Sequence, residues 1–300
     1  MVAIGGDSGT GKSTLGKGIH AIFGPDRIVE IRLDDYHALD RAQRRAVGLT
    51  ALNPRVNNFA AMEEDLWQLA QGRTISKPVY DHADGTFGPN ETIVPADIVI
   101  VEGLFPLYTR ALRSMFDVSV WLDPQNALKV AWKLQRDTAQ RGYSADEVSA
   151  EIAKRQSDIN AYIAPQEKYA DLVVRFARPG QGADDAKLDA RITKGGRFAP
   201  LDYRHFASNS THLRQIDGGE GPYPRTIIEL DGDVDDATAA EVEDEIWRHL
   251  GAHHGLRPDR LGVFDDGTCT RVSHTLALSQ LLIARRICLV LDQLSGAVAA

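Results

Sequence analysis

The chain has 300 residues, 43% of them hydrophobic and 25% charged, which is ordinary for a globular protein and long enough for one large domain or two smaller ones. Its formal net charge of −8 argues against sequence-independent binding of nucleic acid, because such binding needs a basic surface. Two cysteines, Cys269 and Cys288, make neither a disulfide framework nor a Cys-x-x-Cys zinc motif. With no signal peptide before the first motif and no apolar run of roughly 18 residues, we expect a cytoplasmic protein that binds no membrane.

The first motif follows a short apolar strand at 2–5 and precedes a helical pattern at 15–23. It has the form G-x-x-x-x-G-K-[ST], the phosphate-binding P-loop, in the strand-to-helix context that the motif requires. Its residues are Gly6, Asp7, Ser8, Gly9, Thr10, Gly11, Lys12, Ser13 and Thr14. Backbone N–H groups of such a loop, together with the start of the helix, bind phosphate. The motif predicts a nucleotide site in which Lys12 reaches the β- and γ-phosphates and the Ser13 hydroxyl ligates magnesium.

The next elements alternate between strand and helix patterns. Strands are predicted at 27–33, 97–103, 118–122 and 172–176, and helices at 59–71, 124–141 and 145–161, with a hairpin-like insertion at 75–94. Residues 38–57 are expected to be loop or short helix. This alternation predicts an α/β fold with a doubly wound, mostly parallel sheet.

A boundary is expected at 178–182, where Pro and Gly cluster. We therefore predict a core domain over 1–177 and a smaller α+β region over 183–300. The strands of this region are predicted near 187–193, 226–231 and 261–264, and its helices near 237–249 and 276–294. Residues 195–224 are rich in Gly, Pro, Ser and Asn and are expected to be loop.

Carboxylates follow two of the predicted strands. Asp34 and Asp35 end the strand at 27–33, and only one of them can enter a site easily, because neighbouring side chains on an extended segment point to opposite faces. Either could serve as a catalytic base, or both could belong to a solvated turn. Glu102 ends the apolar strand at 97–103 and is predicted to be a magnesium or water-network ligand.

Lys129, Lys133, Arg136 and Gln140 recur at helical spacing and make one mostly cationic stripe, with Asp137 and Arg141 beside it. Such a stripe is more often a solvated helix face than a site. The functional alternative is that Lys133, Arg136 and Arg141 receive phosphate. His37 and Arg41, four residues apart, could supply an acceptor pocket. Tyr80, Asp81 and His82 give no clear indication from sequence alone.

The stretch 33–41, Leu-Asp-Asp-Tyr-His-Ala-Leu-Asp-Arg, closely resembles phosphoribulokinases of the plant and cyanobacterial type. Further matching stretches lie at 50–59, 77–82, 101–106, 131–142 and 158–166. The likeness covers 1–176 nearly end to end, and a weaker match resumes at 276–282. The P-loop and Pro78-x-Tyr80 are shared with uridine and pantothenate kinases, whereas 34–41 and 132–142 are specific.

The resemblance implies phosphorylation of ribulose 5-phosphate by ATP with Mg²⁺, giving ribulose bisphosphate, in a homodimer. It assigns the general base to Asp34 and a second catalytic acid to Asp137. It makes His37, Arg41, Lys133, Arg136 and Arg141 ligands of the acceptor sugar and the phosphates, and Glu102 the metal-linked acid. The plant-type enzymes carry regulatory cysteines where this chain has Thr10 and Arg32, so control by that disulfide is not expected.

Two alternatives remain open from sequence. One is a related small-molecule kinase of the uridine kinase superfamily. The other is a nucleotide-binding switch that transfers no phosphate to a metabolite.

Overall fold

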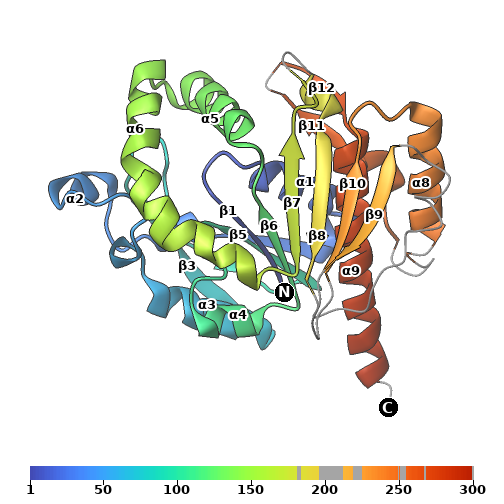
Figure 1. Ribbon diagram of the computed structural model, residues 1–300. Helices are drawn as coiled ribbons and strands as arrows, with labels where there is room; N and C mark the ends of the chain where they lie inside the picture. The colour runs from blue at the N-terminus through green and yellow to red at the C-terminus, as the bar shows by residue number, and fades with distance from the viewer. Residues whose placement is uncertain are drawn as a thin grey trace. The chain divides into compact units, whose positions relative to one another are not determined.

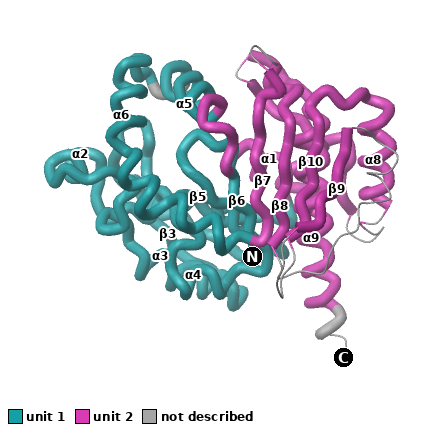
Figure 2. The backbone as a smooth tube through the Cα atoms, in the orientation of Figure 1, with its two compact units in different colours: residues 1–12, 26–122, 129–170 teal, residues 13–25, 123–128, 171–300 magenta. Residues whose placement is uncertain are grey.

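The computed structural model describes residues 1–180, 184–195, 212–218, 225–248, 250, 255–266 and 268–298 (Figure 1). The chain forms two compact units (Figure 2). The first contains Met1–Lys12, Asp26–Leu122 and Lys129–Ala170, and the second contains Ser13–Pro25, Asp123–Leu128 and Asp171–Ala300.

The first unit is built on four parallel strands in the order β2-β5-β1-β6. They are β1 (Val2–Gly6), β2 (Ile28–Arg32), β5 (Ile98–Gly103) and β6 (Val118–Leu122). Every residue of β1 and β6 is buried, which explains why all of them except Ser119 are apolar or glycine. Because parallel strands end at one edge of the sheet, the P-loop after β1 and the acidic residues that end β2 and β5 come together.

Helices and a hairpin complete this unit. They are α2 (Arg41–Ala46), α3 (Phe59–Ala70), β3 (Ile75–Tyr80), β4 (Phe87–Ile93), α4 (Arg110–Met115), α6 (Ala145–Asp158) and, from Lys129 on, α5 (Asn126–Arg141). The side chain of Asn58 caps α3 by accepting the N–H of Ala61, and Ser144 forms a capping box with Glu147 at the start of α6. A π-helical turn, Ile159–Ile163, continues α6.

The second unit has four antiparallel strands in the order β7-β8-β10-β9. They are β7 (Leu172–Ala177), β8 (Asp189–Lys194), β9 (Leu213–Gly218) and β10 (Arg225–Leu230). The other elements are α1 (Lys12–Phe23), α8 (Asp236–Arg248), the short hairpin β11 (Val263–Asp265) and β12 (Thr270–Val272), and α9 (His274–Val298). Within this unit α1 approaches α9 at Gly18, where an added Cβ would lie 2.0 Å from Nε2 of Gln280.

The fold class predicted from the sequence is confirmed: an α/β chain whose parallel part is followed by antiparallel strands and helices. Strand β6 has the predicted bounds, and β7 begins where predicted and ends at residue 177. The loop prediction for 195–224 is wrong at β9, while 196–211 and 219–224 lie outside the described residues. Strand β9 lies at the edge of the sheet, and its partner among the described strands is β10, so half of its residues are exposed and it lacks the apolar run that marks a buried strand.

Helix α9 is long and apolar enough over His274–Ser295 to cross a membrane by length and composition alone. However, 72% of this window is buried inside the structure, which is typical of a core helix. It packs against α8 and β8 in its own unit. The expectation that the protein binds no membrane stays a prediction.

Close packing at the end of β5 generates a stability prediction. A Cβ on Gly103 would lie 2.5 Å from the Cβ of Leu33, the residue just before Asp34, so Gly103→Ala forces the backbone or Leu33 to shift. We expect it to lower the free energy of unfolding by roughly 1–3 kcal/mol, as overpacking does. The matched control is Gly88→Ala, where the nearest atom to the new Cβ is 4.0 Å away. Equal denaturant midpoints for the two variants would contradict the prediction.

Candidate active site

The P-loop closes tightly at the end of β1. Gly9 and Gly11 have φ angles of 84° and 88°, a region that residues with a Cβ rarely adopt. The Nζ atom of Lys12 donates to the carbonyl oxygens of Gly6 (3.1 Å) and Asp7 (2.7 Å), so the lysine curls back over the loop. Ser13 and Thr14 lie in the first turn of α1. The loop has the conformation that presents backbone N–H groups and one ammonium group to a phosphate chain.

Lys12 lies in an acidic environment. Burial lowers its pKa, and the negative charges of Glu102, Asp34 and Asp7 act in the opposite direction. The net pKa is below the ordinary value of a lysine. Three carboxylates from the three strand ends thus interact electrostatically with the lysine that the motif assigns to phosphate.

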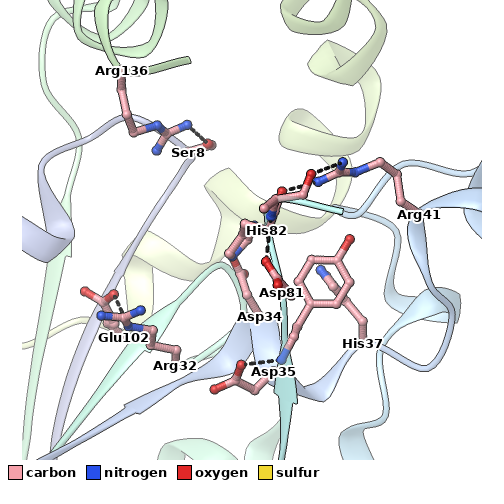
Figure 3. A network of polar contacts seen from close by, with 12 residues as sticks. Ser8, Arg32, Asp34, Asp35, His37, Arg41, Asp81, His82, Glu102 and Arg136 are labelled. Atoms are coloured by element: carbon pink, nitrogen blue, oxygen red, sulfur yellow. Dashed lines mark hydrogen bonds and ion pairs between the residues drawn. The ribbon is translucent and has the colours of Figure 1, made fainter. Parts of the chain in front are cut away.

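The adjacent residues Asp34 and Asp35 lie in a 3₁₀ turn, Leu33–Tyr36, and their carboxylates contact different partners. Asp35 is buried: Oδ2 accepts from Nζ of Lys77 (2.6 Å), and Oδ1 accepts the N–H of Tyr80 (2.8 Å). These bonds tie the turn to strand β3. Asp34 points the other way, toward His82 (Figure 3). The two side chains point in different directions, as predicted, but the predicted reason is wrong, because the pair lies in a 3₁₀ turn and not on an extended segment.

Asp34 is held in its ionised form. Burial would raise its pKa, but the hydrogen bond with His82 and the positive charges around it, including that of Lys12, outweigh burial. The pKa therefore lies well below the usual aspartate value. Nε2 of His82 lies 3.4 Å from Oδ2 of Asp34. An aspartate in this state can accept a proton or a hydrogen bond at neutral pH.

Arg41 contacts the turn that carries His82. Its guanidinium donates to the carbonyl oxygens of His82 (2.5 Å) and Ala83 (3.3 Å), as Figure 3 shows in part. Its backbone N–H also donates to the carbonyl of Gly85 (2.9 Å). Arg41 therefore holds the tip of the β3–β4 hairpin in place. His37 is buried beside this turn, with its ring edge-on to Tyr80 at 4.9 Å.

Helix α5 contacts the P-loop through the predicted cationic stripe. Lys133 and Asp137 are both buried and form an ion pair of 2.6 Å, and Arg136 lies 2.8 Å from the same aspartate. Nη2 of Arg136 also donates to Oγ of Ser8 (3.1 Å; Figure 3). Lys129 pairs with Asp7 at 3.1 Å. The stripe is thus not a solvated face, and its charges gather at the phosphate loop.

In this cluster the charges of neighbouring side chains shift the pKa values of Lys133 and Asp137. Burial raises the pKa of Asp137, but Lys133 and Arg136 outweigh it, so the net pKa is lowered. Burial also lowers the pKa of Lys133, with Asp137 opposing the shift. Arg141 is the last residue of α5, and its side chain lies outside the described residues.

Glu102 lies at the end of β5, in register with Ile4 of β1 and Arg32 of β2. Its carboxylate is 3.9 Å from the guanidinium of Arg32 (Figure 3). Among the described residues no group of three or more His, Cys, Asp or Glu side chains could hold a metal by itself. A magnesium ion bound here would resemble those that take one or two protein ligands and fill the other positions with water and phosphate oxygens.

The sequence analysis gave no role in the site to His82, Lys77 or Asn57, and it named Lys129 only as a member of the cationic stripe. Lys77 and His82 come from the β3–β4 hairpin, and each meets the Asp34–Asp35 turn across more than forty residues. The stretches 50–59 and 77–82, which contain Asn57, Lys77 and His82, were noted only as part of the family resemblance, and neither carries a recognisable catalytic spacing.

Comparison with known proteins adds the decisive observation. Residues 1–179 match the family described as the Phosphoribulokinase / Uridine kinase family. The chain belongs to this family. It is 44% identical to the phosphoribulokinase of Synechocystis over 58% of this chain and 53% of that protein, and 36% identical to the chloroplastic phosphoribulokinase of Chlamydomonas reinhardtii over 62% and 54%.

Other members are more distant. A uridine kinase of Lactobacillus helveticus is 30% identical over 65% of this chain and 92% of that protein. A solved phosphoribulokinase structure from Rhodobacter spheroides has a TM-score of 0.60 at 18% identity, over 83% of this chain and 95% of that one, which shows a shared fold. The chain spans about half the length of the curated phosphoribulokinases that it matches.

The buried Asp35–Lys77 pair generates a second stability prediction. Asp35→Ala leaves the ammonium of Lys77, 4% exposed, without its nearest carboxylate. We expect the free energy of unfolding to fall by about 3 kcal/mol, the lower end of the usual range for a broken buried pair. The lower end applies because Glu91 still lies 3.2 Å from Nζ of Lys77. Removing the exposed carboxylate of Asp26 by Asp26→Ala should change stability by less than about 0.5 kcal/mol. Chemical denaturation compares the two, and a similar loss for both variants would refute a special role for the pair.

Proposed function

We propose that the protein is a kinase that transfers the γ-phosphate of ATP to the primary hydroxyl of ribulose 5-phosphate. The observation that carries the proposal is the ionised Asp34, which interacts electrostatically with Lys12 of the P-loop in a chain 44% identical to a phosphoribulokinase. Family membership supports ATP as the donor, and the higher identity to phosphoribulokinases than to uridine kinases supports a sugar phosphate as the acceptor.

The proposed step needs a nucleophile, a base and charge stabilisation. The acceptor hydroxyl oxygen forms a bond to the γ-phosphorus while the bond from that phosphorus to the β,γ-bridging oxygen breaks. ADP leaves with that electron pair, and the hydroxyl proton passes to the carboxylate of Asp34. A carboxylate with a lowered pKa is a weak base, so it takes the proton only late in the reaction. Until then its main role is to orient the hydroxyl group for attack. Lys12 and the loop N–H groups stabilise charge on the transferred phosphate.

Magnesium is part of the proposal. Ser13, in the first turn of α1, and Glu102, at the end of β5, are oxygen donors of the kind that Mg²⁺ prefers. Magnesium held by such donors would supply positive charge that offsets the charge of the phosphates.

The cations of α5 support an acceptor that already carries phosphate. Lys133 and Arg136 are held at the P-loop by Asp137, and uridine offers no phosphate for them to bind. We propose that Arg136, Lys133 and Arg141 act on the acceptor and transferred phosphates and that Asp137 keeps the first two in place. Arg41 has a second proposed role in fixing the hairpin tip, besides any contact with substrate.

A homodimer in the cytoplasm is also proposed. The dimer is supported only by the family resemblance, because the long apolar helix α9, whose exposed face could otherwise favour a dimer, is largely buried.

The experiment is a panel of acceptors in a coupled assay for ADP release. Ribulose 5-phosphate should stimulate ADP formation far more than uridine, ribose 5-phosphate or pantothenate. Equal or faster turnover with uridine would assign the chain to the uridine kinase branch, and ADP formation that ignores every acceptor would favour a nucleotide switch.

A second test is the variant Asp34→Asn, which keeps the shape of the side chain and removes the proposed base. Its acceptor-dependent rate should fall by roughly 10²–10⁴-fold, while binding of ATP measured by calorimetry survives. Near-normal turnover would remove Asp34 from the mechanism.

A further inference from the structure

Asn57 has an orientation that its own hydrogen bonds determine. Its Nδ2 donates to two carbonyl oxygens, those of Ala51 (3.1 Å) and Asn53 (3.0 Å). A carbonyl oxygen only accepts, so both contacts require the amide nitrogen at that position and direct the amide oxygen the other way. Asn57 is 9% exposed, and its backbone forms a β-bridge with His37.

The amide oxygen of Asn57 lies 2.9 Å from Nδ1 of His37. Because this oxygen can only accept, Nδ1 carries the proton, and a neutral His37 has its lone pair on Nε2. Within the described chain Nε2 makes no hydrogen bond to the protein. The Nε2 atom of His37 can therefore accept a hydrogen bond from a ligand that binds beside Asp34.

The charges that face His37 come from three elements: Asp34 in the 3₁₀ turn, Arg44 in α2 and His82 in the hairpin. Burial lowers the pKa of His37, and Arg44 and His82 add to this, while Asp34 and the bond to Asn57 oppose it. The net pKa lies below the ordinary histidine value, so the ring is neutral at pH 7.5. A neutral ring with a bare nitrogen repels phosphate oxygens and attracts a hydroxyl hydrogen.

We propose that Asn57 is a positioning residue that fixes the tautomer of His37, so that Nε2 accepts a hydrogen bond from a hydroxyl group of the acceptor substrate. The inference rests on the proposed kinase function and specifies how its acceptor is bound. His37 then binds a hydroxyl group of the acceptor, and the cationic side chains of α5 bind its phosphate. Sites built to bond a hydroxyl reject analogues that lack it far more strongly than apolar pockets do.

The tautomer is tested on the protein alone by ¹⁵N NMR of imidazole nitrogens, with the His37 resonances assigned from their loss in His37→Gln. At pH 7.5 we expect a protonated Nδ1 and an unprotonated Nε2. A proton on Nε2, or a fully protonated ring, would overturn the inference and leave the proposed kinase function untouched. Conversely, a protein inactive with ribulose 5-phosphate would remove the kinase proposal while the tautomer stood.

The role of Asn57 is tested by Asn57→Asp. A carboxylate beside Nδ1 favours the charged ring, so the pKa of His37 rises, by about one unit or more. Activity needs the neutral ring and is lost as pH falls through that pKa, so the acid limb of kcat/KM for ribulose 5-phosphate should move to higher pH by the same amount, with the KM for ATP unchanged.

The matched control is Asn58→Asp, which adds the same charge one residue away, where Asp caps α3 as well as Asn does. Its acid limb should stay in place. An unmoved limb in Asn57→Asp, or equal shifts in both variants, would contradict a positioning role. If Asn57→Asp does not fold, the inference is still tested by the His37 tautomer that ¹⁵N NMR detects in the unaltered protein.

Discussion

The site depends on the separation of two adjacent carboxylates in the turn after β2. Asp35 is bonded to Lys77 and to the backbone of Tyr80, which fixes the turn against the β3–β4 hairpin. Asp34 is thereby directed toward His82 and the charge of Lys12. Neither carboxylate could take the other's place, because one needs a buried ammonium partner and the other an open approach for a ligand.

The same hairpin positions more than Asp34. Through Lys77 it anchors the turn, through His82 it contacts the partly buried carboxylate of Asp34, and through the carbonyls of its tip it binds Arg41. Helix α5 brings Arg136 to Ser8 and Lys129 to Asp7, so side chains of this helix also hold the P-loop. The arrangement is preorganised: charges that phosphoryl transfer requires are already paired and oriented.

The sequence was sufficient for the fold class, most elements and the P-loop, because these follow from local periodicity and fixed spacing. It was insufficient where contacts span long stretches of chain. The stripe on α5 has the same pattern whether it is solvated or buried, and only tertiary packing reveals that Lys133 and Asp137 are buried. His82 and Asn57 could not be found by spacing, since each acts through a partner that folding alone brings near. Strand β9 was missed because an exposed edge strand needs no apolar run.

The most direct measurement is the titration of Asp34 followed by ¹³C NMR of its carboxyl carbon, assigned by comparison with Asp34→Asn. The positive environment of the turn predicts that this carboxyl remains ionised at pH values below the ordinary aspartate pKa of about 3.9. A midpoint at or above that value would show that the site does not hold an ionised aspartate beside the phosphate loop, and the account of the site would be wrong.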